Sequence, residues 1–157
     1  MIKRVFDILM AMFGLILLSP LLIIISFIVK LDKGPIFYSQ IRVGLNGKEF
    51  RLYKFRSMVI DADKIGGYST MPGDKRVTLV GQFIRKTSID ELPQLLNVIL
   101  GNMSLVGPRP NVPAQSKEYT KEQWEKRNRV IPGITGIAQS RSRSGATWQE
   151  RYDMDIE

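Results

Sequence analysis

The stretch Ile8–Val29, ILMAMFGLILLSPLLIIISFIV, decides the fold because it contains no charged residue. At about 1.5 Å per residue it would form a straight helix of roughly 33 Å, about the thickness of the hydrocarbon core of a bilayer. The remaining chain is too small to bury such a helix. No small-x-small cleavage site of a signal peptide precedes Lys30. The stretch therefore predicts a membrane-inserted helix.

Ser19-Pro20 lies at the middle of this stretch. Pro20 cannot donate a hydrogen bond to the carbonyl of Ile16, so a bend is expected, and Ser19 can bond a carbonyl that the bend frees. The basic residues that flank the stretch are balanced: Lys3 and Arg4 before it, Lys30 and Lys33 after it. The positive-inside rule therefore gives no direction across the bilayer. A hairpin that returns to the same face and a kinked spanning helix both fit, and these features slightly favour the hairpin.

The composition narrows the possible chemistry. The 157 residues suffice for one domain, and the net charge of +8, from 23 Lys plus Arg and 15 Asp plus Glu, indicates an anionic partner. Because the chain has no Cys and no His, disulfides and thiolate chemistry are excluded, and a typical zinc site is not expected. A catalytic acid, base or nucleophile would therefore be a carboxylate, Lys, Tyr or a hydroxyl. If the protein binds a metal ion, Mg²⁺ is the leading candidate.

The rest of the chain predicts an α+β domain. Gly34-Pro35 marks a break, so we expect a membrane helix over residues 1–33 and a soluble domain over 34–157. Strands are expected at 36–43 and 50–55, joined by an Asn-Gly turn. Helices are expected at 59–65, 79–85, 89–100 and 117–129, with an extended segment at 106–113 and an irregular tail after residue 132. The chain ends inside a helical pattern, so a truncated C-terminus is expected.

Ser88-Ile89-Asp90-Glu91 opens the helix expected at 89–100. Ser-x-x-Glu is a capping box, which is the structural interpretation of these acidic residues. Pro93 leaves the N-cap open: with Ser88 in that position the proline would cost a hydrogen bond, whereas with Asp90 it would not. The functional interpretation is a carboxylate pair among basic residues, which can stay ionised, bind Mg²⁺ and meet a diphosphate. Its basic neighbours are Arg85, Lys86 and Arg109.

Several blocks resemble the bacterial sugar transferase family, the monotopic phosphoglycosyl transferases. The matching blocks are Arg85 to Val98, Met103 to Pro110, Pro132 to Gly136, Lys54 to Met58 and Ser19-Pro20. They occur in the order typical of the family, and the resemblance extends over nearly the whole chain.

The resemblance implies a specific reaction. It implies a re-entrant membrane helix broken at Ser19-Pro20, which strengthens the hairpin interpretation, and Asp90-Glu91 matches the catalytic dyad of the family. Asp90 would attack the sugar-bearing phosphate of a nucleotide sugar, usually a UDP-sugar, form a covalent phosphosugar intermediate and release UMP. Polyprenyl (undecaprenyl) phosphate would then take the sugar phosphate, as the first membrane step of polysaccharide or glycoconjugate synthesis. Mg²⁺ would lie beside Asp90, and Glu91 would assist in positioning or proton transfer.

The phosphate-binding residues implied by the family are Lys54, Arg56, Arg85, Pro108, Arg109, Pro110 and Arg143. The family often has Asn-Gly-Arg-Asn after an Ala-Gln pair, whereas Ala138-Gln139 is followed here by Ser140 to Gly145. Arg143 is the preferred match to the family Arg, and Arg141 is its rival. This departure bears on the phosphate contact and on donor specificity.

The resemblance also implies a cellular location and partners, and the charge suggests alternative functions. The resemblance implies a monotopic enzyme at the cytoplasmic face of the bacterial inner membrane, with donor, acceptor and lipid as partners, a second copy as a further candidate, and no nucleic acid. A non-catalytic, membrane-anchored binder of anionic lipid or nucleic acid is the alternative that the charge alone suggests. A transferase fold that has lost activity is a third possibility, against which the intact dyad argues. Trp124 in the helix expected at 117–129 fits the membrane interface or a solvated helix with i,i+4 pairs, and the latter is preferred.

Overall fold

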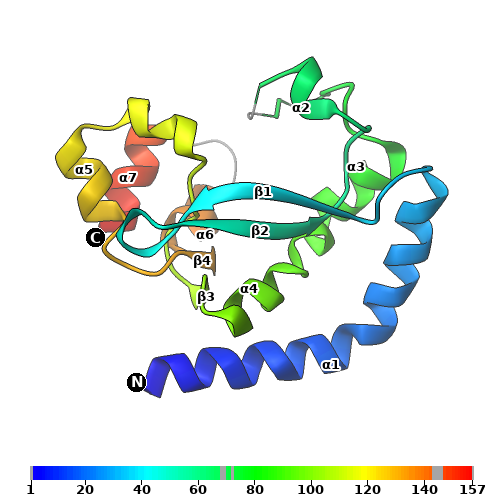
Figure 1. Ribbon diagram of the computed structural model, residues 1–157, viewed down its shortest axis with the longest axis horizontal. Helices are drawn as coiled ribbons and strands as arrows, with labels where there is room; N and C mark the ends of the chain where they lie inside the picture. The colour runs from blue at the N-terminus through cyan, green and yellow to red at the C-terminus, as the bar shows by residue number, and fades with distance from the viewer. Residues whose placement is uncertain (1, 68–69, 72, 143–146, 157) are drawn as a thin grey trace.

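The computed structural model describes residues 2–67, 70–71, 73–142 and 147–156, and it has the expected α+β composition. Helix α1 (Ile2–Leu31) is a single helix with Pro20 inside it, and it changes direction near its middle (Figure 1). The Ser19 hydroxyl donates to the Ile16 carbonyl at 2.8 Å, which is the carbonyl that Pro20 leaves unbonded. The predicted bend is confirmed, and it lies within one continuous helix.

Most residues of α1 are exposed to the surroundings of the protein. Its buried residues are Asp7, Ala11, Ile25 and Val29, whereas Ile16, Leu17 and Phe27 are more than 60% exposed. The helix is long and apolar enough to cross a membrane by length and composition, and only 11% of its most apolar window is buried. A core helix of a soluble protein would be mostly buried, so this exposure agrees with insertion into lipid.

A β-hairpin follows α1, as the sequence predicts. Strands β1 (Phe37–Val43) and β2 (Glu49–Phe55) pair antiparallel, from Phe37 opposite Phe55 to Val43 opposite Glu49. The short turn η1 (Leu45–Gly47) joins them, with Asn46 and Gly47 both at positive φ. The Asn-Gly pair tolerates this backbone conformation, which explains why the hairpin could be read from the sequence.

The helix expected at 89–100 is broken. Helices α2 (Ala62–Ile65) and α3 (Leu79–Lys86) lead to a 3-10 turn, η2 (Ile89–Glu91), and helix α4 (Gln94–Leu100) begins only after Pro93, its N-cap. Ser88 lies in the left-handed region at φ 59° and its side chain makes no cap hydrogen bond. Both N-cap assignments of one continuous helix are therefore wrong, because the chain turns at Ser88 and restarts at the proline.

The C-terminal part is more regular than expected. Strands β3 (Ser104–Val106) and β4 (Gly133–Thr135) pair in parallel, and helices α6 (Ile137–Ser142) and α7 (Trp148–Ile156) follow. A Cβ on Gly133 would lie 2.1 Å from the Gly107 nitrogen, so this close approach requires glycine. The turn η3 (Pro113–Glu118) precedes helix α5 (Lys121–Arg127), where Thr120 and Gln123 form a capping box. The helix expected at 117–129 is thus shorter.

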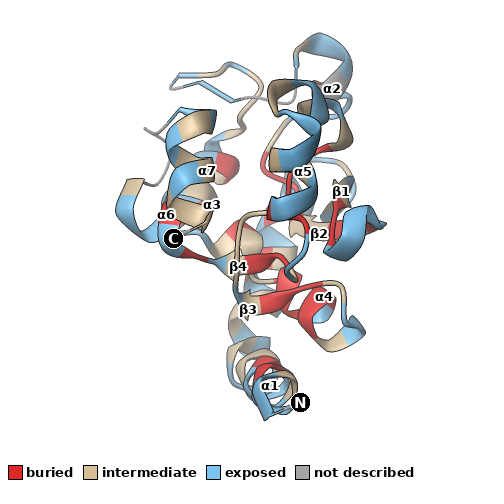
Figure 2. Ribbon diagram, turned by 90° about the vertical axis from the view of Figure 1, so that its left-hand side faces the viewer, coloured by how far each residue is buried: buried red, intermediate tan, exposed pale blue. Residues whose placement is uncertain are grey.

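Two apolar clusters hold the two halves of α1 against the domain. Ala11 packs in a cluster with residues of β2 and α4, including Leu52, Leu95 and Val98. Ile25 and Val29 pack with residues of β2 and α3 in a second cluster, which includes Phe55 and Ile84. Figure 2 shows the buried residues gathered around β2, α4, β3 and β4, above a largely exposed α1. The domain therefore rests in the angle of the bent helix.

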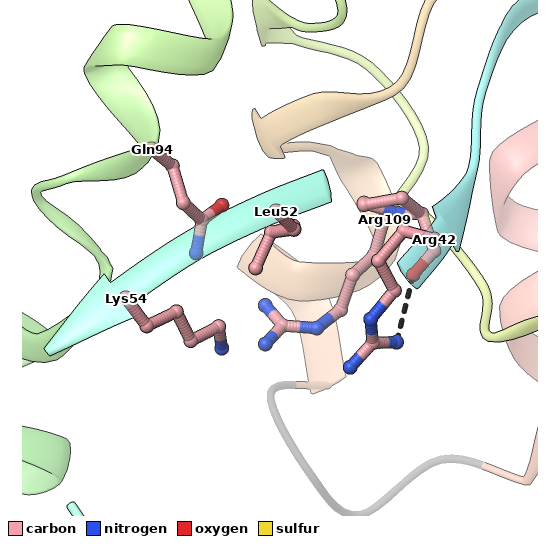
Figure 3. A pocket seen from close by; sticks show the side chains of 6 residues that line it. Arg42, Leu52, Lys54, Gln94 and Arg109 are labelled. Carbon is pink, nitrogen blue, oxygen red and sulfur yellow. Dashed lines mark hydrogen bonds between the residues drawn. The ribbon is translucent and has the colours of Figure 1, made fainter. Parts of the chain in front are cut away.

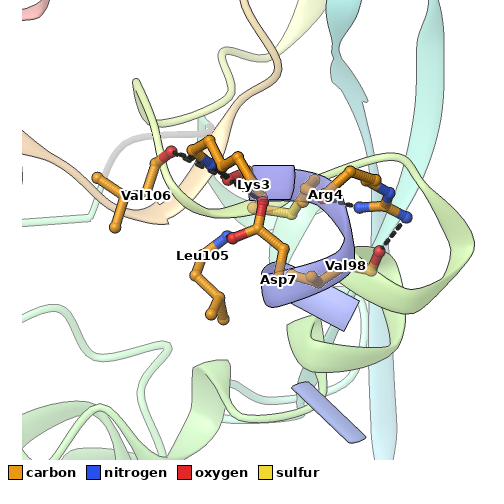
Figure 4. Close-up of polar contacts among 8 residues, drawn as sticks. Lys3, Arg4, Asp7, Val98, Leu105 and Val106 are labelled. Atoms are coloured by element: carbon orange, nitrogen blue, oxygen red, sulfur yellow. Dashed lines mark hydrogen bonds and ion pairs between the residues drawn. The ribbon is translucent and has the colours of Figure 1, made fainter. Parts of the chain in front are cut away.

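A cluster of polar residues, which we call the N-terminal clamp, ties the start of α1 to the domain (Figure 4). Arg4 donates to the carbonyls of Val98, Ile99 and Met103 at the end of α4. Asp7 accepts from Lys3 and from the Ser104 hydroxyl, at 3.0 and 2.8 Å. The charges before the apolar stretch thus bind protein groups as well as flanking the membrane segment.

Candidate functional site

The acidic dyad lies on the short turn η2, between two helices. Arg85 is in the last turn of α3, Ser88 reverses the chain, and Pro93 starts α4. Asn97 fixes α4 to strand β2, because its side chain accepts from the Tyr53 N–H at 3.1 Å and donates to the Arg51 carbonyl at 2.8 Å. These contacts bring Glu91 beside Lys54, the next residue of β2.

Glu91 is held by two cations. Lys54 Nζ lies 2.8 Å from Glu91 Oε1, and Arg109 donates to both carboxylate oxygens, at 2.6 and 3.3 Å. Burial alone would raise the pKa of Glu91, but the charges and hydrogen bonds of Lys54 and Arg109 outweigh burial and hold the pKa at about 2. A carboxylate in this state is a structural anchor and a poor proton acceptor at neutral pH.

Asp90 has a different environment, although it is the adjacent residue. It is 6% exposed, and its carboxylate makes no hydrogen bond or ion pair with any residue in the described ranges. Burial and the charge of Glu91 raise the pKa of Asp90, against the opposing charges of Lys54, Arg85 and Arg109. The two carboxylates of the site therefore differ. Both oxygens of Glu91 accept hydrogen bonds from cations, whereas Asp90 is buried near the same cations and bonds none of the described residues.

The Pro108-Arg109-Pro110 segment is held through its backbone. The Pro108 carbonyl accepts from the Gly133 N–H at 2.9 Å, and the Arg109 carbonyl accepts from Arg127 at 2.9 Å. Arg127 also forms a buried ion pair with Asp155 of α7 at 2.7 Å. The extreme C-terminal helix therefore supports the segment that presents Arg109 to Glu91, a link that the sequence did not indicate.

Arg42 and Gln94 are further residues of the site that the sequence interpretation missed. A small pocket beside the dyad is lined by Arg42, Leu52, Lys54, Gln94, Arg109 and Pro110 (Figure 3). Arg42 Nη1 donates to the Pro110 carbonyl at 3.0 Å, and Nη2 donates to Gln40 Oε1 at 2.7 Å. The sequence around an Arg in a strand does not show which pocket its side chain enters. The available signal was the alternation of side chains along β1, which indicates only the face of the hairpin on which Arg42 lies.

The remaining predicted residues lie apart from this pocket. Arg56 is buried and donates to the carbonyls of Pro35, Met58 and Val29, so its guanidinium joins the end of α1 to the hairpin. Among the described residues the Arg85 side chain makes one long hydrogen bond, to the Ser57 hydroxyl at 3.5 Å, and its charge lowers the pKa of Asp90. Arg141 lies in α6, and Arg143 lies outside the described residues, so the choice between them stays a prediction.

A magnesium ion would find few protein ligands here. The described residues hold no group of three or more acidic side chains that could bind a metal. Asp90 is the available ligand, because both oxygens of Glu91 already accept from cations. Mg²⁺ commonly binds through one or two carboxylates, with waters and substrate phosphates completing its shell, so the residues fit an ion that is shared with a substrate.

The chain is similar to several known proteins. It is 44% identical to the uncharacterized sugar transferase EpsL of Bacillus subtilis, over 99% of this chain and 76% of EpsL. It is 43% identical, over its whole length, to UDP-glucose:undecaprenyl-phosphate glucose-1-phosphate transferase of Escherichia coli, of which it covers 36%. A putative undecaprenyl-phosphate N-acetylgalactosaminyl 1-phosphate transferase of Bacillus subtilis is 47% identical over 85% of this chain and 71% of that protein.

These relatives agree with the family model. The model described as bacterial sugar transferase matches residues 1–157, which include α1, the dyad and the Pro-Arg-Pro segment. With this match, and with relatives above 40% identity that are named as transferases, the chain belongs to the bacterial sugar transferase family.

Proposed function

We propose that this protein transfers a sugar 1-phosphate from a UDP-sugar to undecaprenyl phosphate, through a covalent intermediate on Asp90, with release of UMP. The observation that carries the proposal is the contrast within the dyad. Glu91 bonds Lys54 and Arg109, whereas Asp90 is buried beside the same cations and its carboxylate has no bonding partner among the residues that the structure describes. A nucleophile needs a free lone pair, so Asp90 suits the attack and Glu91 suits positioning.

The reaction consists of two displacements at one phosphorus atom. A carboxylate oxygen of Asp90 attacks the phosphorus that bears the sugar, and the bond from that phosphorus to the bridging oxygen breaks, so that UMP leaves with the electron pair. An oxygen of the acceptor phosphate then attacks the same phosphorus and releases the carboxylate, which forms the diphosphate product. Both leaving groups depart as stable anions, which agrees with a chain that lacks His.

The cations of the site supply electrostatic stabilisation. Lys54, Arg85 and Arg109 all act on Asp90, and they would face the negative charge that the phosphoryl group carries during transfer. We also propose that Mg²⁺ binds at Asp90, where it would neutralise the diphosphate. Arg109 is suited to a phosphate contact, because its side chain is 42% exposed while it holds Glu91.

The placement of α1 supports a re-entrant membrane segment. Arg4 near its start binds the end of α4, and Val29 near its end packs in the cluster of α3 and β2. Both ends of the helix therefore contact the same domain, whereas a spanning helix would separate its ends by the bilayer thickness. We propose that the bend at Ser19-Pro20 dips into one leaflet and that the domain lies at the cytoplasmic face of the inner membrane.

The test measures UMP release from a panel of UDP-sugars by the purified protein with undecaprenyl phosphate and Mg²⁺. We expect release with at least one donor, none from Asp90→Asn, and normal release from Asp61→Asn, the same chemical change at an exposed site. Intact-mass measurement should show a phosphosugar adduct on the wild type with donor alone. Turnover by Asp90→Asn at the normal rate would overturn the covalent mechanism.

The non-catalytic binder loses support from the comparisons. Several relatives are named as transferases that act with undecaprenyl phosphate, so the basic charge is better explained by phosphorylated substrates and anionic lipid than by nucleic acid.

A further inference from the structure

We propose that Arg42 is a phosphate-binding residue of this site and that, with Gln94, it forms a second anion subsite beside the dyad. This inference rests on the proposed function for its substrate class, a nucleoside or lipid phosphate. Neither residue had a role assigned from the sequence: Arg42 lies in β1, outside the matching blocks, and Gln94 is the first residue of α4, inside the block from Arg85 to Val98.

The first argument is the excess of donors. A guanidinium has five N–H donors, and the two hydrogen bonds of Arg42 go to the Pro110 carbonyl and to Gln40 Oε1. Arg42 Nε and Gln94 Nε2 are both buried without a partner in the described part of the chain. Buried donors are normally bonded, so two unpaired donors at one pocket indicate that an acceptor is missing.

The second argument is charge. The charged ends of Lys54, Arg109 and Arg42 lie in a row, with Arg109 in the middle (Figure 3). Glu91 bonds Lys54 and Arg109, whereas within the described part of the chain the side chain of Arg42 bonds two neutral oxygens. Burial and the neighbouring charge of Arg109 lower the pKa of Arg42 to about 10, although Tyr38 and Glu91 act to raise it. A bound phosphate would supply the missing negative charge.

The third argument is position. Arg42 lines one pocket with Lys54 and Arg109, the two cations that bond Glu91, and Asp90 is not among the described residues that line it. This subsite suits a phosphate that is not under attack: the phosphate of the departing nucleotide, or the phosphate of the acceptor lipid before its own attack.

A purely structural role for Arg42 is the alternative, because its bond to Pro110 helps to hold the Pro-Arg-Pro segment. The two roles differ in anion binding. We therefore propose titration of inorganic pyrophosphate, UMP and farnesyl phosphate into the full chain in detergent, measured by calorimetry. The proteins are the wild type, Arg42→Gln, Arg42→Lys and Arg51→Gln. Arg51 is the matched control, since it lies on the same hairpin, is exposed and undergoes the same change of charge.

We expect Arg42→Gln to weaken pyrophosphate binding by about 10- to 100-fold, the size of one or two lost charge-assisted hydrogen bonds. Arg42→Lys should lie between it and the wild type, and Arg51→Gln should bind normally. A parallel loss for UMP alone would assign the subsite to the donor, and a loss for farnesyl phosphate alone would assign it to the acceptor.

Unchanged affinity for all three probes in a folded Arg42→Gln protein would overturn the inference, and if that variant does not fold, Arg42→Lys decides by the same criterion. These outcomes are separate from the proposed function. A wild type that binds pyrophosphate through Arg42 but releases no UMP from any donor would contradict the proposed reaction and leave the anion subsite in place.

Discussion

The N-terminal clamp and the acidic dyad are both polar clusters of the same domain, but their bonding differs. In the clamp, Arg4 bonds three backbone carbonyls, and Asp7 bonds Lys3, the Ser104 hydroxyl and the Leu105 N–H. At the dyad, Asp90 has no bonding partner among the described residues, and Arg42 has unused donors. A saturated cluster suits a structural joint, whereas an unsaturated one suits a site that awaits a ligand.

The comparison also predicts different effects for substitutions in the clamp and at the dyad. Substitutions in the clamp should act on stability and affect activity only through folding. Substitutions of unsaturated groups at the dyad should act on binding or chemistry with little loss of stability, because few bonds are broken.

The largest expected effect is that of Asp90→Asn. Loss of the proposed nucleophile should lower transfer by at least about 10³-fold. Its thermal midpoint should stay the same or rise, because the raised pKa of Asp90 means that holding its charge in the folded state costs stability at neutral pH. Transfer assays and thermal unfolding in detergent measure the two effects. A large fall in the midpoint would show that Asp90 is a structural residue and would break the comparison.

Arg4→Met should have the next largest effect, on stability. It removes charged donors from the carbonyls of Val98, Ile99 and Met103, and hydrogen bonds of this kind contribute about 1.5–3 kcal/mol. Chemical denaturation in detergent should show a loss of that order. Arg129→Met, at an exposed position, is the control and should change the free energy of unfolding by less than about 0.5 kcal/mol. A stable Arg4→Met protein with impaired transfer would contradict the structural role of the clamp.

The sequence predicted the features that depend on residues close together in the chain, and it did not predict those that depend on residues far apart. The hairpin depends on the local Asn46-Gly47 turn and the bend of α1 on Pro20, so both could be predicted. The pairing of β3 with β4 joins residues that are far apart in sequence, and the break before Pro93 depends on the left-handed turn at Ser88. Neither has a strong local pattern.

The same reasoning explains the site. Asp90, Glu91 and Arg109 were found because they lie in contiguous motifs, and the structure brings Glu91 and Arg109 together with Lys54. The dyad was predicted as a pair, but the difference between its members depends on which carboxylate the distant cations reach. Arg42 lies in a strand whose alternation gives only the face of the hairpin, so no periodicity could place it beside Pro110.

Glu91→Gln sharpens the comparison within the dyad. We expect turnover to fall by about tenfold, because Lys54 and Arg109 lose their shared anion and their positions loosen. The pH profile is the more specific measurement. The proposed mechanism requires ionised Asp90, and the pKa of Asp90 is raised, so UMP release should fall on acidification at a pH above the ordinary aspartate value of about 3.9.

The variant should move this acidic limb to lower pH. Removal of Glu91 takes away a charge that raises the pKa of Asp90 and leaves the charges of Lys54 and Arg109, which lower it. Glu91 itself has a lowered pKa, so its own stabilising contribution is present above about 4.5 and is lost as the pH falls toward 2. That loss lies below the activity limb and does not obscure it. An acidic limb that stays in place or moves upward would contradict the coupling of the two carboxylates.

The smallest effect is expected for Gly101→Ala, which changes the backbone next to the clamp. Gly101 ends α4 at φ 92°, and a Cβ there would lie 3.4 Å from Arg4 Nη2. Gly101→Ala should therefore cost about 1 kcal/mol through the left-handed conformation and a slight shift of Arg4. Gly67→Ala is the control, because a Cβ there meets nothing within 4 Å and its φ is ordinary. Since the clamp is saturated and remote from the reacting groups, the folded Gly101→Ala protein should retain the wild-type kcat; a lower kcat at full folding would mean that the clamp also positions the site.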